Sequence, residues 1–172
     1  QGQKNILREP RRGDILDARG NLLATSVFVK TVFADPTLLG DCQAKVARAI
    51  APLLELNEGE LYNRLLPRLR VNDQGQVLTN RSGQPLTNCY VVLKRKVALE
   101  TWQQVTQAMV QLANRARVQA ESLAPKHRLS LEQRAFFLNL GRGAVFAEED
   151  QLRVYPNQSL AAHVVGHVGM QE

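Results

Sequence analysis

The sequence contains no long apolar run, only two cysteines and few aromatic residues. Its longest apolar stretches are strand-sized, such as residues 27–34, whereas a membrane span needs roughly 20 apolar residues. Residues 1–12 are polar and basic, so we expect no signal peptide there, and the missing initial Met suggests a piece of a longer protein. Cys42 and Cys89 belong to no C-x-x-C pair, which argues against a zinc site. We interpret them as small buried thiols in preference to a disulfide.

The charge balance is basic, with 22 Lys and Arg against 16 Asp and Glu and a net charge of +6. Such a charge favours contact with anionic surfaces. Nucleic-acid binders usually place aromatic residues beside the basic ones for base stacking, but aromatics make up 5% of this chain and few lie near its basic runs. We therefore expect solvated basic surface, with attraction to anionic lipid and no contact with nucleic acid. A nucleic-acid-binding protein is an alternative that rests on charge alone.

Common enzyme signatures are missing from the sequence. It has no G-x-x-x-x-G-K-[ST] and no G-x-S-x-G, and Gly141-Arg142-Gly143 lacks the third glycine of a dinucleotide-binding loop. His163 and His167 have metal-ligand spacing, but a zinc protease needs Glu directly after the first histidine. We expect no cofactor and no metal. A small hydrolase is the weakest alternative, since a triad assembled from distant residues is invisible in a sequence.

The N-terminal part of the chain predicts a β-hairpin. Residues 14–18 alternate between polar and apolar side chains and predict a short strand. Residues 19–21 predict a turn, because Gly and Asn tolerate positive φ. Residues 22–34, rich in Val and Phe, predict a second strand that ends before Pro36.

The rest of the chain mixes helices and strands. The predicted helices cover residues 46–54, 57–69 with Asn57 as N-cap, 100–123, part of 126–140, and 159–168. The predicted strands cover residues 89–97 and, on both sides of an acidic turn at 148–150, residues 143–154. Residues 71–88 predict a loop or a loosely held hairpin, and no internal repeat is apparent. The mixed order predicts an α+β fold.

Two segments of the sequence contain motifs that are specific enough to indicate a protein family. Residues 12–24 read RGDILDARGNLLA, and this segment resembles the motif R-G-x-I-x-D-R-x-G-x-x-L-A, which opens class B penicillin-binding proteins. Residues 153–169, RVYPNQSLAAHVVGHVG, resemble that family's later segment R-x-Y-P-x-G…A-x-H-x-x-G. Residues 26–36 are similar to the division-type branch, and residues 91–95 to the strand before the family's long helix. The resemblance covers nearly the whole chain.

The resemblance assigns structural roles to residues of these motifs. They are Arg12, Gly13, Asp17, Arg19, Gly20, Leu23, Ala24, Arg153, Tyr155, Pro156, His163 and Gly166. The sequence departs from the family pattern at two places. Ala18-Arg19 stands where Arg followed by a variable residue is usual, and Gln158 stands where Gly is common. We hypothesise that Asp17 pairs with Arg12, Arg19 or Arg153, since bidentate Arg–carboxylate geometry fixes a junction between distant segments.

The family's catalytic motifs are missing from this chain. Catalysis in the family uses Ser-x-x-Lys, Ser-x-Asn and Lys-[Thr/Ser]-Gly. The chain's serines are Ser26, Ser82, Ser122, Ser130 and Ser159, and none has Lys three positions later. Lys30-Thr31 is followed by Val32 in place of Gly. We therefore expect no catalytic residue in this chain.

The resemblance implies a non-catalytic pedestal module. Residues 1–36 and 144–172 are expected to form a β-rich stem and residues 41–140 a mainly helical head, with the transpeptidase domain beyond this chain. The implied partners are that domain and the septal peptidoglycan synthesis complex, including a polytopic glycan polymerase, and a homodimer is left open. The implied location is the periplasmic side of the bacterial membrane, with the N-terminal anchor helix outside this chain. A free-standing periplasmic scaffold is an alternative.

Overall fold

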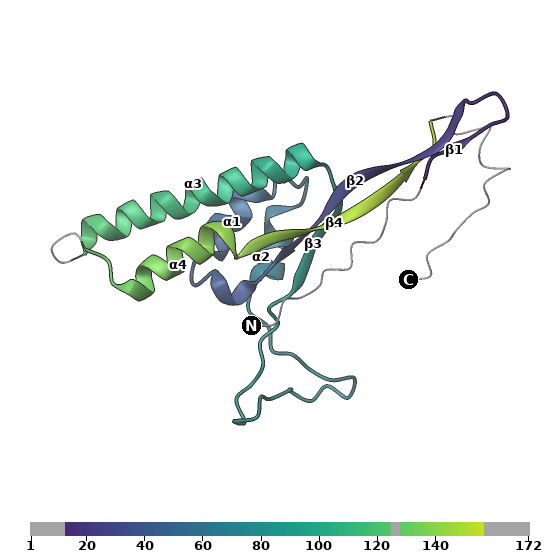
Figure 1. Ribbon diagram of the computed structural model, residues 1–172. Helices are drawn as coiled ribbons and strands as arrows, with labels where there is room; N and C mark the ends of the chain where they lie inside the picture. The colour runs from purple at the N-terminus through teal and green to yellow at the C-terminus, as the bar shows by residue number, and fades with distance from the viewer. Residues whose placement is uncertain (1–12, 125–127, 157–172) are drawn as a thin grey trace. The chain divides into compact units, whose positions relative to one another are not determined.

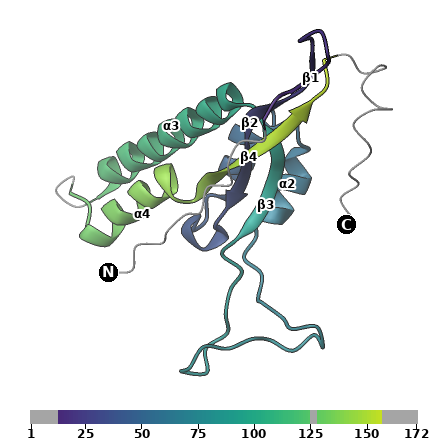
Figure 2. The same cartoon turned by 45° about the vertical axis from the view of Figure 1, so that its right-hand side comes forward.

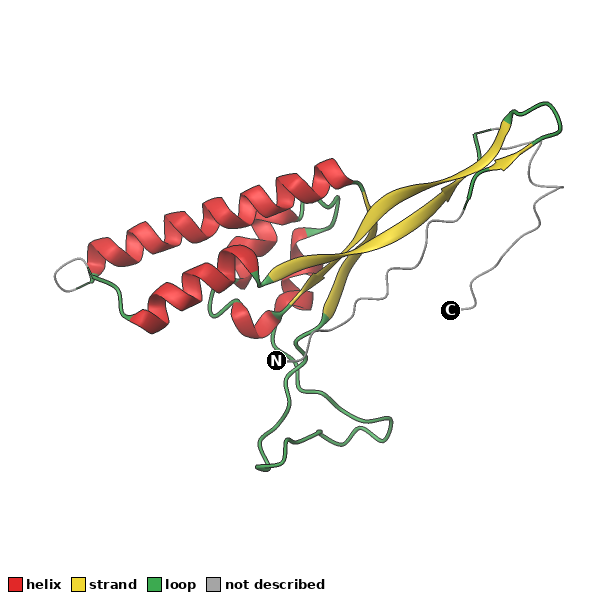
Figure 3. Cartoon of the chain, in the orientation of Figure 1, coloured by secondary structure: helices red, strands yellow, loops and turns green. Residues whose placement is uncertain are grey.

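The computed structural model describes residues 13–124 and 128–156, and it confirms the α+β class (Figures 1 and 3). The elements are β1 (Ile15–Leu16), β2 (Leu22–Ala34), the 3-10 helix η1 (Pro36–Leu38), α1 (Gln43–Ile50), α2 (Glu58–Leu65), β3 (Val91–Val97), α3 (Leu99–Leu123), α4 (Leu131–Arg142) and β4 (Val145–Val154). The chain divides into two compact units. We call residues 1–29 with 150–172 the terminal unit and residues 30–149 the central unit.

The terminal unit contains the predicted N-terminal hairpin. β1 pairs antiparallel with β2 through Ile15–Ala24 and Leu16–Leu22, with a bulge between the two pairs. The β1 strand is shorter than the predicted strand 14–18 because Asp17 already belongs to the turn. In that turn Gly20 has a φ of +82° and donates its backbone N–H to the Asp17 carbonyl. A turn closed by this bond and ending on a left-handed glycine suits a three-residue hairpin loop.

The sheet of the central unit is built on β2, whose bounds match the predicted strand 22–34. β3 pairs antiparallel with its second half, from Lys30–Val97 to Ala34–Val91, and β4 also pairs with β2. The predicted acidic turn at 148–150 is wrong, because β4 runs unbroken through these residues. The acidic side chains stand on the strand, where Glu149 forms an ion pair with Lys30 at 3.6 Å.

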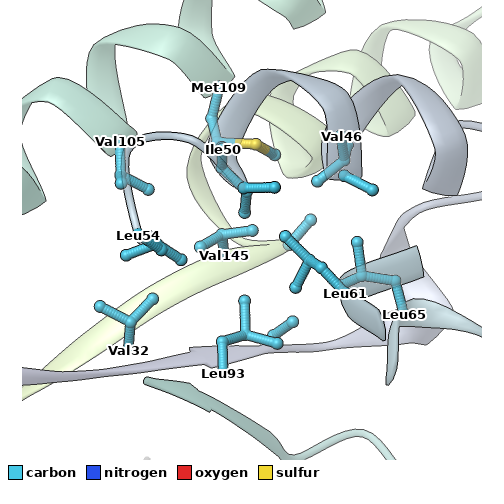
Figure 4. Packing of buried hydrophobic residues seen from close by; sticks show 14 of the residues in the cluster. Val32, Val46, Ile50, Leu54, Leu61, Leu65, Leu93, Val105, Met109 and Val145 are labelled. Atoms are coloured by element: carbon cyan, nitrogen blue, oxygen red, sulfur yellow. The ribbon is translucent and has the colours of Figure 1, made fainter. Parts of the chain in front are cut away.

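The core of the central unit lies between this sheet and the helices (Figure 4). Along β2, Val32 and Ala34 are fully buried in the core, whereas the intervening Phe33 points to the other face and contacts Tyr90 and Phe146. α1 packs against α2 and α3, and α3 against α4. Buried side chains of this core that Figure 4 labels are Val32, Val46, Ile50, Leu54, Leu61, Leu65, Leu93, Val105, Met109 and Val145.

The two short helices begin or end at local signals. Asn57 caps α2 as predicted, because its side chain accepts hydrogen bonds from the N–H groups of Gly59 and Glu60. The helix ends at Leu65, so the predicted extension to Leu69 is wrong. Leu66 has an extended backbone because Pro67 follows it. α1 likewise ends before the predicted residue 54, at residue 50.

The two long helices follow their predicted positions. α3 occupies the predicted range 100–123 with one residue more at its start. α4 begins after Ser130, whose hydroxyl accepts from the Gln133 N–H while the Gln133 side chain accepts from the Ser130 N–H, a complete capping box. The predicted helix at 159–168 lies outside the described residues.

Residues 68–88, between α2 and β3, contain no helix or strand, as the prediction of a loop or loose hairpin at 71–88 requires, but they form an ordered three-lobed insert. Its sequence contains an eight-residue repeat that the sequence analysis missed, RVNDQGQV at 70–77 and LTNRSGQP at 78–85, continued by LTN at 86–88. In each repeat an asparagine opens a turn: Asn72 and Asn80 each accept two backbone N–H bonds on their side-chain oxygens. Asn88 accepts from the Tyr90 N–H in the same way.

A closed ring of backbone hydrogen bonds holds the insert together. The Leu78 N–H donates to the Arg70 carbonyl, the Leu86 N–H to the Leu78 carbonyl, and the Arg70 N–H to the Leu86 carbonyl, each at 2.8 Å. These residues are eight positions apart, so the ring has pseudo-threefold symmetry. The first lobe turns at residues 72–76, the second at residues 80–84, and the third is where the chain enters and leaves through residues 68 and 88. A backbone ring needs no apolar core, which explains why hydrophobic patterning did not reveal it.

Candidate functional site

Asp17, a residue of the N-terminal motif, organises the hairpin turn between β1 and β2. Its carboxylate accepts hydrogen bonds from the Arg19 and Asn21 N–H groups and from the Asn21 side-chain amide, each at 2.8 Å. These bonds, that from the Asn21 side chain foremost, lower the pKa of Asp17, and partial desolvation opposes them. Asp17 is therefore a turn-forming residue that is held ionised.

The hypothesis that Asp17 pairs with Arg19 or Arg153 is wrong. Within the described part of the chain its carboxylate bonds only to the turn, through the Arg19 backbone and Asn21. The reason is local geometry: donors two and four residues away reach the carboxylate at no cost in chain closure. Arg12, the remaining candidate of the hypothesis, lies outside the described residues.

Arg153 instead joins the two ends of the terminal unit. Its Nη1 donates to the Gly13 carbonyl at 2.7 Å and to the Ser26 hydroxyl at 3.1 Å. Ser26 is only 4% exposed, so Arg153 satisfies a buried hydroxyl on β2. We call these three residues the Arg153 junction. Sequence reasoning missed Ser26, because β2 also contains Thr25, Lys30 and Thr31, so a further polar residue in it gave no distinct signal.

The other motif residues have ordinary structural surroundings. Ala24 is fully buried in β2 and pairs with Ile15, and Leu23 beside it is half-buried. Tyr155 and Pro156 are exposed at the end of β4. His163 and Gly166 lie outside the described residues. The structure thus brings Gly13 and Arg153 together from opposite ends of the chain, while Asp17, Arg19 and Gly20 meet in one turn.

The central unit has a shallow groove along the first half of α3. Its volume is about 660 Å³ and it is lined by Lys30, Leu99, Trp102, Gln103, Thr106, Gln107, Val110 and Gln111. Amides, a hydroxyl and one indole dominate this lining, which suits contact with another chain. The residues that line it include no nucleophile next to a base.

Three aromatic rings cover the sheet face opposite the helices. Phe33 lies 4.3 Å from Tyr90 and 5.6 Å from Phe146, measured between ring centroids. Tyr90 remains exposed, and desolvation together with its hydrogen bond to Glu148 raises the pKa of its phenol. Tyrosine that presents an apolar ring and a polar tip is common at protein contacts, so this cluster is a second candidate contact surface.

The cysteines do not form a reactive or metal-binding site in the described structure. Cys42 is half-buried, and its burial raises the pKa of its thiol. Cys89 is exposed, which corrects the prediction of two buried thiols, because it lies where the chain leaves the insert. Residues 13–124 and 128–156 hold no cluster of His, Cys, Asp or Glu that could bind a metal ion. Among the same residues, no helix is both long and apolar enough to cross a membrane.

Comparison with known proteins gives one family and several solved structures. A family model described as Penicillin-binding Protein dimerisation domain matches residues 7–172. The fold is similar to a peptidoglycan synthetase from Bifidobacterium adolescentis, with 23% identity and a TM-score of 0.42 over 86% of this chain and 22% of that one. It is also similar to a structure of penicillin-binding protein PBP2 with MreC from Helicobacter pylori, with 19% identity and a TM-score of 0.45. That match covers 92% of this chain and 22% of the other. The match to penicillin-binding protein 2X from Streptococcus thermophilus has 14% identity and a TM-score of 0.43, and it covers 86% of this chain and 17% of the other.

A search of the curated proteins found no match. The chain spans about a fifth of the length of the solved chains that it resembles.

Proposed function

Because the chain belongs to the penicillin-binding protein dimerisation domain family, we propose that it is the non-catalytic pedestal and interaction module of a class B penicillin-binding protein. The observation that carries the proposal is the Arg153 junction, which ties the N-terminal strand to the last described strand. A ribbon fixed in this way connects a membrane anchor on one side to a catalytic domain on the other. In this proposal residues 1–36 and 144–172 are the stem, which includes the terminal unit, and residues 41–140 of the central unit are the head.

The chemistry belongs to the transpeptidase domain that follows the pedestal. None of the five serines has Lys three positions later, so the acylating pair of the family is missing from this chain. The parent is a serine-type D,D-transpeptidase that cross-links peptidoglycan at cell division, on the outer side of the cytoplasmic membrane. The division role rests on residues 26–36, which resemble the division-type branch.

The head supplies contact surfaces for the synthesis complex. The groove along α3 is open, and in the cluster of Phe33, Tyr90 and Phe146 the Tyr90 ring is exposed on the described structure. The partners in this proposal are the protein's own transpeptidase domain, a polytopic glycan polymerase of the septal complex and a second copy of the same module.

Labelling with a fluorescent penicillin tests whether the acylating serine lies in the C-terminal domain and not in this chain. The 172-residue chain is expected to remain unlabelled, whereas the same chain joined to its C-terminal domain is expected to become labelled. Replacing the serine of Ser-x-x-Lys with Ala in the longer protein is the matched control, and it is expected to abolish labelling. Labelling of the 172-residue chain by itself contradicts the proposal.

Co-purification with the polymerase tests the contact surface. Gln107→Glu replaces an exposed carboxamide of the groove by a charged carboxylate of nearly the same shape. It is expected to weaken the complex at least several-fold. Arg134→Asp, on the exposed side of α4, is the control and is expected to leave it unchanged. Equal binding of both variants removes the groove from the proposal.

A further inference from the structure

The insert has one face that carries six side chains and no charge. Bridged partners in antiparallel strands share a face, and so do residues two positions apart. The bridges Leu69–Thr87, Val71–Val77 and Thr79–Pro85 therefore place these six side chains on one face of the insert. The ring residues Arg70, Leu78 and Leu86 alternate with them and take the other face. Figure 2 shows the insert extending away from the helices as a separate lobe.

This six-residue face is unusually apolar for a surface that the protein leaves open. Leu69 is 51% exposed, Val71 56% and Val77 44%. The insert folds through its backbone ring, so these side chains are not needed to form a core of their own. Clustered exposed aliphatic residues favour pairing with another apolar surface.

Two opposite charges occupy equivalent positions in the repeat. Asp73 follows Asn72 in the first lobe, and Arg81 follows Asn80 in the second lobe. Both side chains are exposed, and neither forms an ion pair within residues 13–124 and 128–156. A pseudo-threefold unit with one acidic lobe and one basic lobe is complementary to a copy of itself.

We propose that two copies of the protein associate face to face through the insert. A two-fold axis that lies in the interface and passes between the two lobes sets the first lobe of one copy over the second lobe of the other. Asp73 then pairs with the partner's Arg81, and Arg81 with the partner's Asp73, so that the contact forms twice. The aliphatic residues of the two faces become buried between the rings.

The charge pattern favours a second copy over other occupants. The other charged residues of the insert, Arg68 and Arg70, take the ring face by the same alternation, so a polyanion on the six-residue face is attracted to Arg81 and repelled by Asp73 in the neighbouring lobe. A second copy satisfies both charges at once. The inference deepens the proposed function by giving self-association a location, and it rests on that function only for its biological meaning.

Sedimentation equilibrium of the 172-residue protein over a range of concentrations tests the proposal. The unaltered protein is expected to dimerise weakly, because the insert offers less area than a standard protein interface. Asp73→Arg and Arg81→Asp each place like charges together at two points, and each is expected to weaken the dimer about tenfold or more. The double variant Asp73→Arg with Arg81→Asp restores the pairing and is expected to return to within about threefold of the unaltered dimer.

The variants are expected to fold, because the same turn position holds Asp in one lobe and Arg in the other. Arg134→Asp on α4 changes the net charge by the same amount as Arg81→Asp and is expected to leave the dimer unchanged. A protein that stays monomeric overturns the inference, as does a double variant that remains as weak as the single ones. Neither result affects the penicillin-labelling test, so the two proposals fail separately.

Discussion

At the residue scale, one side-chain device recurs three times in this chain. Asp17, Asn72 and Asn80 each open a turn by accepting the N–H groups two and four positions later. A glycine with positive φ stands three positions after each of them, at Gly20, Gly75 and Gly83. The five-residue pattern therefore encodes the turn locally, in the terminal unit and in the insert alike.

The recurrence predicts how Asp17 responds to substitution. Asp17→Asn keeps a side-chain oxygen acceptor, as in the insert, and is expected to preserve the turn at neutral pH, whereas Asp17→Ala removes the acceptor and weakens it. The lowered pKa of Asp17 in the folded state means that ionised Asp17 stabilises the turn above its ordinary pKa of 3.8, and that this contribution is lost as pH falls through the lowered folded value. Urea unfolding at pH 7 and at about pH 3 measures both effects.

Asp17→Asn is expected to lack the part of the pH dependence that comes from this carboxyl. Asp73→Asn is the matched control, because it changes an exposed carboxyl at the second position of an equivalent turn. The interpretation fails if the control flattens the pH dependence as much as Asp17→Asn does.

Arg153 gives a second residue-scale prediction. Arg153→Met keeps much of the aliphatic bulk but removes the donors to the Gly13 carbonyl and the Ser26 hydroxyl. It is expected to cost about 1–3 kcal/mol, because Ser26 loses a charged partner while it stays buried. Faster amide exchange at residues 22–29 reports the loss. Arg134→Met, at an exposed position of α4, is expected to have little effect, and equal losses in the two variants refute the role of the junction.

At the element scale, the packing of α3 against α4 depends on a close approach at one glycine. Gly141 is buried in α4, and a Cβ placed there lies 3.1 Å from the Cβ of Ala113 on α3. Small residues at this point let the two helices approach closely, and the backbone of α4 becomes part of the packed surface.

Gly141→Val is therefore expected to push the helices apart and to lower the free energy of unfolding by about 1–3 kcal/mol through overpacking. Chemical denaturation measures this change. Asn139→Val places the same β-branched side chain on the exposed side of α4 and controls for helix propensity. If Asn139→Val destabilises the protein as much as Gly141→Val, the close approach is not the cause.

At the scale of the whole molecule, apolar burial is concentrated in the central unit. Every residue of the main core cluster, from Val32 to Val145, belongs to that unit. The described terminal unit is held mainly by hydrogen bonds of its strands, of the Asp17 turn and of the Arg153 junction. The central unit therefore provides most of the hydrophobic stabilisation of the chain.

A cavity-creating substitution in this core tests whether apolar burial in the central unit provides most of the stability. Leu61→Ala removes a side chain that is buried between α2 and the sheet and is expected to lower the free energy of unfolding by about 2–5 kcal/mol. Tyr62→Ala, one residue later and exposed, is expected to change it by less than about 1 kcal/mol. Calorimetry or urea unfolding compares the two variants, and similar losses contradict this account of the core.

Elements whose signals are local could be predicted from the amino-acid sequence. The Val- and Phe-rich alternation of residues 22–34 predicted β2, Asn57 predicted the start of α2, and the apolar stripe of residues 100–123 predicted α3. Each signal lies within the element that it predicts. The insert was predictable in part, since asparagine and glycine recur in it every eight residues.

Contacts between distant groups depend on how the whole chain folds. Arg153 bonds to Gly13 and Ser26 because β1 and β4, far apart in the sequence, both pair with β2, and no local pattern carries that information. β4 stays extended through its acidic residues because β2 pairs with it and Lys30 neutralises Glu149. The ring that joins Arg70, Leu78 and Leu86 forms between backbone groups, which every residue type shares, so its closure leaves no mark in side-chain hydrophobicity.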